Sequence, residues 1–121
     1  MTNLAVNADV PVQTIKTVEG KAAHGDIQLK VMMAGDAMTV LEITYAVGAG
    51  TPMHVHQHES MVYVMSGRVA MIVGKDHYEL SPGDTCRHPQ GVPHSVEGLE
   101  RSVVLEIKSP AIPIANFLGT D

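Results

Sequence analysis

Short apolar runs separated by turn residues constrain the fold of this chain most strongly. Each run is rich in β-branched residues or methionine, and glycine, proline, serine or aspartate lies between one run and the next. No long segment repeats its apolar residues with the period of an amphipathic helix. The runs are Ile27–Met33, Met38–Val47, His54–Met65, Arg68–Val73, His77–Leu80, Asp84–His88, Ser95–Val96 and Val103–Ile107. The pattern predicts an all-β sandwich or barrel.

The size of the chain is that of one domain. Apolar residues make up 45% of the 121 residues, which suffices for a hydrophobic core. We therefore expect a single domain over residues 1–121. Residues 1–20 and 109–121 are predicted to be arms that pack across the barrel or a partner, because the C-terminal segment is too apolar for a solvated linker.

Charge and cysteine content narrow the partners and the compartment. The net charge of −5 at pH 7 argues against nucleic acid or an anionic membrane as the main partner. The N-terminus has neither a basic start nor a sustained apolar stretch, so we expect no signal peptide and no membrane span. The single Cys86 excludes an internal disulfide and fits a reducing compartment, and a cytoplasmic location is the expectation.

Three histidines at alternate positions are the strongest chemical signal. On a strand, His54, His56 and His58 would share one face, because successive side chains point to opposite sides. A further histidine, His94, follows a hairpin predicted at residues 74–76. Strands separated in this way can face each other across a barrel, so His94 can meet His54 and His56. Imidazole nitrogens suit a divalent transition metal: Fe, Ni, Mn, Zn or Cu.

Two segments around these histidines carry glycines and prolines at further fixed positions. The first has Gly48, His54, His56 and Gly67, and the second has Gly83, Pro89, Gly91 and His94. In both segments the spacing resembles the two short motifs of the cupin superfamily. The resemblance implies a double-stranded β-helix, or jelly-roll, barrel with a metal in its lumen.

The sequence departs from the cupin motifs at two positions. The place of the family's glutamate ligand is Ser60, and Glu59 is one residue out of register, which turns its side chain to the opposite face. The place of the family's final asparagine is Gly98. The nearest resemblance is to small single-domain cupins with glutamine in the glutamate place, including the pectin-degradation type that linearises unsaturated uronates. The predicted metal ligands are His54, His56 and His94, with Ser60, His58 or water at the fourth position.

Three further residues are candidates for catalysis. His58 is predicted to lie on the same strand face as the metal ligands, and the ordinary pKa of histidine suits a general acid or base. Cys86 and His88 share one face of their predicted strand, and Arg87 takes the other. If Cys86 and His88 face the lumen, both lie near the metal. If the parity is reversed, Arg87 enters the pocket and binds a substrate carboxylate.

Apolar residues on the outer faces of two predicted strands indicate an interface. If Ser60 points inward, then Met61, Tyr63 and Met65 point outward, and both faces of Arg68–Val73 are apolar. Contiguous exposed apolar surface marks an interaction site, so we predict a homodimer packed through these strands.

These features support three hypotheses of function. The first is a metal-dependent enzyme of isomerase, lyase or cyclase type that acts on a small-molecule substrate. The second is a three-histidine Fe(II) dioxygenase, because such enzymes occur among cupins without the glutamate ligand. The third is a non-enzymatic cupin that binds a small ligand.

Overall fold

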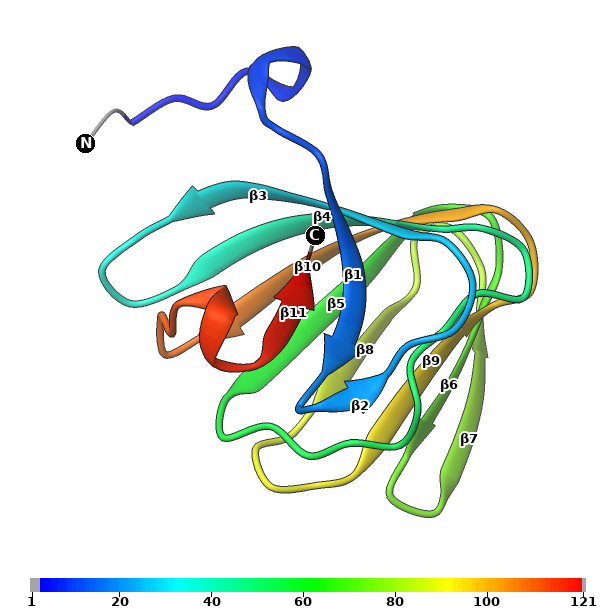
Figure 1. Ribbon diagram of the computed structural model, residues 1–121. Coiled ribbons are helices and arrows are strands. Elements are labelled where there is room, and N and C mark those ends of the chain that lie inside the picture. The colour runs from blue at the N-terminus through cyan, green and yellow to red at the C-terminus, as the bar shows by residue number, and fades with distance from the viewer. Residues whose placement is uncertain (1–2, 121) are drawn as a thin grey trace.

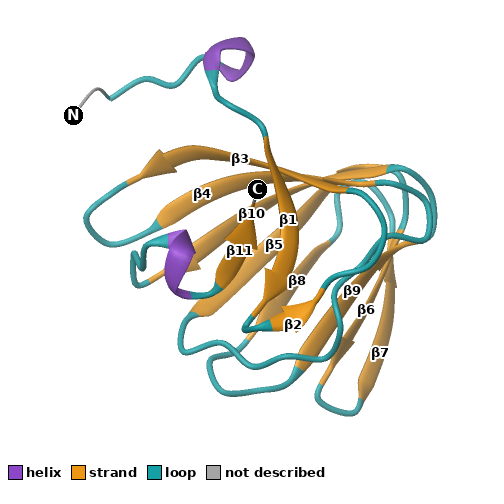
Figure 2. Cartoon of the chain, viewed as in Figure 1, coloured by secondary structure: helices purple, strands orange, loops and turns teal. Residues whose placement is uncertain are grey.

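The predicted strands form two antiparallel β-sheets in a computed structural model that describes residues 3–120 (Figure 1). The larger sheet has eight strands in the order β11-β1-β3-β4-β10-β5-β8, with β2 paired to β1, and the smaller has the order β7-β6-β9. The strands are β1 (Gln13–Val18), β2 (Lys21–Ala22), β3 (Ile27–Ala34), β4 (Thr39–Tyr45), β5 (Glu59–Ser66), β6 (Val69–Val73), β7 (Asp76–Leu80), β8 (Thr85–His88), β9 (His94–Gly98), β10 (Ser102–Ser109) and β11 (Leu118–Thr120). Two short 3₁₀ helices, η1 (Asn7–Asp9) and η2 (Ile114–Asn116), complete the elements (Figure 2).

Strands that are distant in sequence lie next to each other. Strand β10 pairs with both β4 and β5, and β5 pairs with β8. The smaller sheet faces the larger one, and β6 and β7 form the hairpin expected at residues 74–76. The prediction of an all-β jelly-roll barrel is therefore confirmed.

Alternate residues of the central strands build the core between the sheets. Leu41 and Ile43 of β4 and Val104 of β10 are buried, and their neighbours along each strand are half-buried on the outer face. Burying each such side chain stabilises the fold by about 1.5–3 kcal/mol. The same inward face of β10 continues with two charged residues, Glu106 and Lys108, which are also buried.

Both terminal segments contribute strands to the larger sheet. Residues 13–18 form β1, and the C-terminal β11 pairs with it. Between η2 and β11, the ring of Phe117 is buried. Residues 1, 2 and 121 of the expected arms lie outside the described residues. Within residues 3–120, no helix has the length and apolar character needed to cross a membrane.

Candidate metal centre

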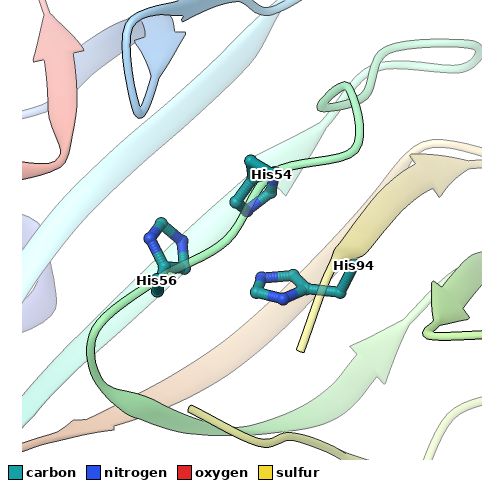
Figure 3. A group of neighbouring side chains, drawn as sticks. All are labelled: His54, His56 and His94. Atoms are coloured by element: carbon teal, nitrogen blue, oxygen red, sulfur yellow. The ribbon is translucent and has the colours of Figure 1, made fainter. Parts of the chain in front are cut away.

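Three histidines from two neighbouring segments converge inside the barrel (Figure 3). His54 and His56 lie in the loop before β5, and His94 begins β9. The backbones of His54 and His94 exchange two hydrogen bonds of 3.0 Å, which holds the two segments side by side. One nitrogen from each of the three rings lies within 4.8 Å of the others, and all three side chains are buried.

Each of the three rings donates a hydrogen bond from its Nδ1 atom to an oxygen. The acceptor is the Pro52 carbonyl for His54, at 2.7 Å, and the Val92 carbonyl for His94, at 3.1 Å. His56 donates to the Glu19 carboxylate at 2.8 Å. These bonds place the proton on Nδ1 and leave the lone pair on Nε2, which is the outer-sphere arrangement of metal-binding histidines.

The surroundings of these histidines keep the rings neutral. Burial lowers the pKa of His54 to about 4, even though its bond to Pro52 acts in the opposite direction. Burial also lowers the pKa of His56, with a further contribution from the charge of Lys108, and burial lowers that of His94. Neutral imidazoles with free lone pairs bind metal, so the ring nitrogens suit a divalent transition metal at neutral pH.

The two residues at the place of the missing carboxylate ligand point in opposite directions. Ser60 is 1% exposed and faces inward, whereas Glu59 lies on the outer side, 3.8 Å from Arg87. Glu59 is therefore not part of the cluster. Within the described part of the chain, the group of converging donor atoms consists of the three histidines alone.

His58 is buried behind the cluster. Its ring stacks on that of His56 at a centroid distance of 4.3 Å and contacts Phe117 at 4.7 Å. Its Nε2 atom accepts a hydrogen bond of 3.0 Å from the Lys108 ammonium. Burial, and then the charge of Lys108, lowers the pKa of His58 to about 4. The lone pair of His58 is thus directed at Lys108 rather than at the cavity.

The side chains of β8 alternate in the first of the two ways considered from the sequence, with Cys86 and His88 on the inner face. His88 and Cys86 point inward, and Arg87 points outward. His88 stacks on the ring of His94 at 4.2 Å and lines the central cavity. Cys86 does not line this cavity; it borders an outer depression between β7 and β8. Burial raises the pKa of the Cys86 thiol, which keeps it protonated.

Three functional candidates lie outside the set expected from the sequence. Glu106 and Lys108 form a buried ion pair on the inner face of β10. In the sequence, both residues follow Val104 at alternate positions, and this spacing could have placed them on the same inner strand face. Glu19 lies in the turn after β1, and no pattern in the sequence links it to His56.

A small cavity joins the histidine cluster to the buried ion pair. Its volume is about 30 Å³, which holds roughly two water molecules. Its polar wall consists of the three histidines of the cluster, His88, Glu106, Lys108, Tyr45 and Thr51. Its apolar wall is made by Ile15, Val18, Leu41, Ile43, Val96 and Leu118. A ligand that reaches the cluster therefore contacts both charged and apolar side chains.

Comparisons with known proteins match this barrel and its central segment. A family model described as a cupin domain matches residues 41–108. A protein of Methanocaldococcus jannaschii without an assigned function is 30% identical over 66 residues, which are 54% of this chain and 53% of that protein. The match thus spans about half the length of that relative.

Several solved structures share the fold of the whole chain. KdgF from a Halomonas species has a TM-score of 0.78 at 24% identity, covering 89% of this chain and 94% of that one. An RmlC-like cupin from Shewanella frigidimarina has a TM-score of 0.83 at 18% identity, covering 95% and 96%. The polyketide cyclase RemF from Streptomyces resistomycificus has a TM-score of 0.76 at 19% identity, covering 93% and 81%. At these identities the similarity is one of fold.

Proposed function

Because the chain belongs to the cupin family, we propose that it is a metal-dependent enzyme that acts on a small molecule, by an isomerase, lyase or cyclase reaction. The proposed metal ligands are the Nε2 atoms of His54, His56 and His94. The observation that carries the proposal is the set of three Nδ1 hydrogen bonds. Because each Nδ1 donates its proton to an oxygen, the Nε2 atom of each ring keeps a lone pair that can bind one shared metal ion.

The three proposed ligands are neutral and leave coordination positions open. When bound, a divalent metal supplies a Lewis acid that polarises a carbonyl or carboxylate oxygen of the substrate. The six apolar side chains of the cavity wall limit the access of water to the bound molecule.

His88 is the proposed proton carrier of the site. Of His58, His88 and Cys86, only His88 lines the cavity. Its Nε2 atom lies 3.4 Å from the sulfur of Met71. Because a thioether has no proton to give, Nε2–H is the donor and the lone pair of His88 lies on Nδ1. That atom can take a proton from a substrate in the cavity.

Reaction type is tested with protein that retains the metal it carries on purification. Small hydroxy- and keto-compounds are incubated with it, and products are followed by NMR with and without oxygen. We expect turnover without oxygen, its loss in His94→Gln together with the metal, and its loss in His88→Gln with the metal retained. His24→Gln, at an exposed position, is the control. Turnover that requires Fe(II) and consumes oxygen would replace this proposal with a dioxygenase, and binding without turnover would replace it with a ligand-binding protein.

We also propose that the chain is a cytoplasmic homodimer. The sequence predicts an interface through β5 and Arg68–Val73, but β6 belongs to the smaller sheet and does not adjoin β5. The proposed interface is instead the outer patch, defined as the outward apolar side chains of β5 and its neighbour β10: Met61, Tyr63, Met65, Val103, Leu105 and Ile107. Tyr63 pairs across the strands with Leu105, and Met61 with Ile107. A second copy would cover this surface. The free, buried Cys86 suits a reducing compartment.

A further inference from the structure

The ion pair of Glu106 and Lys108 is unusual for the interior of a small barrel. The two residues are 6% and 4% exposed and lie on the strand face that buries Val104. Charged side chains are seldom buried this deeply unless they are paired. Well-packed apolar residues would stabilise such a position at least as well as a buried ion pair. A role in ligand binding accounts for charges at this position, and both side chains line the cavity of the histidine cluster.

The surrounding side chains fix the direction of the Lys108 ammonium. Besides its ion pair with Glu106, it donates to Nε2 of His58 at 3.0 Å and to the Ser60 hydroxyl at 3.1 Å. These three acceptors match the three donors of an ammonium group. The hydroxyl of Ser60 is an uncharged acceptor, and an anionic oxygen makes the stronger hydrogen bond. A ligand anion can therefore take the place of Ser60.

The balance of charge in the cavity favours an anionic ligand. Burial alone would raise the pKa of Glu106, but the charge and hydrogen bond of Lys108, together with smaller contributions from His88 and His94, lower it, so the Glu106 carboxylate is ionised. Four histidines line the cavity: His54, His56, His88 and His94. With a divalent cation on three of them, the positive charge exceeds the single carboxylate of Glu106, and uncompensated buried charge is strongly unfavourable.

We propose that Lys108 binds the anionic head of the ligand, and that the ligand is a small organic carboxylate. Glu106, Ser60 and His58 position the ammonium. This inference rests on the proposed metal site, and it adds the chemical class of the substrate and the side chain that recognises it. The cavity of about 30 Å³ limits the group that enters it to about the size of a carboxylate.

Formate, the smallest carboxylate, is the probe, and formamide is its uncharged counterpart. The Co(II)-loaded protein is titrated with each, and binding is followed by the visible spectrum of the metal. We expect Lys108→Met to weaken formate binding about tenfold or more, since a hydrogen bond to a charged group is lost. Lys108→Arg should recover part of the affinity. Glu106→Gln should tighten formate binding, because it frees the ammonium from its counter-ion. Formamide binding should differ little among these variants.

Two controls separate the possible failures. Lys75→Met makes the same chemical change on an exposed turn and should bind formate like the parent protein. The double variant Glu106→Gln/Lys108→Met removes both charges, avoids an unpaired buried carboxylate, and should bind formate as weakly as Lys108→Met. Formate affinity within twofold of the parent in Lys108→Met and in the double variant, at unchanged metal content, overturns the role of Lys108. Absence of metal from the parent protein overturns the proposed function instead.

Discussion

Removal of the Glu19 carboxylate should weaken metal binding without changing any of the three ligands. Glu19 accepts the Nδ1–H of His56 at 2.8 Å, and this bond increases the electron density on the opposite nitrogen of the ring. Loss of such an outer-sphere partner costs about 10- to 100-fold in metal affinity. Because the Glu19 side chain is 31% exposed, water replaces part of the interaction. We therefore expect Glu19→Ala to weaken Zn(II) binding by about tenfold, the lower end of that range.

Two further variants separate the charge of Glu19 from its backbone conformation. Glu19→Gln keeps an acceptor but loses the charge, and should weaken binding by about threefold. Glu19 has a φ of 49°, in the left-handed region, which costs a residue with a side chain about 1 kcal/mol. Glu19→Gly should therefore raise the free energy of unfolding of the metal-free protein while weakening Zn(II) binding like Glu19→Ala. Competition with a chromophoric chelator measures the affinity. Zn(II) affinity within twofold of the parent in Glu19→Ala would refute the reasoning.

Two other predictions concern stability and assembly. The buried histidines His54, His58 and His88 have pKa values lowered from 6.5 to about 4, so the unfolded chain binds more protons between these values. The free energy of unfolding of the metal-free protein should have its full value above pH 6.5 and should fall as the pH drops towards 4. Urea titrations that give equal free energies of unfolding at pH 7 and pH 4.5 would contradict this prediction. Leu105→Glu, in the outer patch, should convert a dimer to a monomer in sedimentation, whereas Leu99→Glu outside it should not; a monomeric parent protein at micromolar concentration would reject the dimer.

The fold was accessible to sequence reasoning because it depends on alternation along strands. The histidine cluster was accessible through its motif spacing, although the strand predicted from His54 begins only at Glu59 and His54 and His56 lie in the preceding loop. A residue parity that places His54 and His56 inward also places Ser60 inward and Glu59 outward, as the structure shows. The same reasoning could have found Lys108, because Val104 is apolar and lies on the same face four residues earlier. From its apolar residues alone, the run Val103–Ile107 predicts only a strand.

Contacts between segments without a shared pattern were not accessible in this way. Glu19 and His56 are 37 residues apart, and their contact depends on the turn after β1 and on a bond from the Glu19 backbone to the Phe117 carbonyl. The direction of the His58 lone pair likewise depends on Lys108, which arrives from β10. The sequence predicts proton transfer by His58 from its strand face and from the ordinary pKa of histidine. Long-range packing decides such details, and strand periodicity does not encode it.

The central claim is that His54, His56 and His94 bind one metal ion through Nε2. Anomalous X-ray diffraction on crystals of protein purified without added metal tests it most directly. We predict one strong anomalous peak at bonding distance, about 2.0–2.1 Å for Zn, from all three Nε2 atoms, with the three Nδ1 hydrogen bonds retained. A site without an anomalous peak, or a metal bound elsewhere or through Nδ1, would contradict the account.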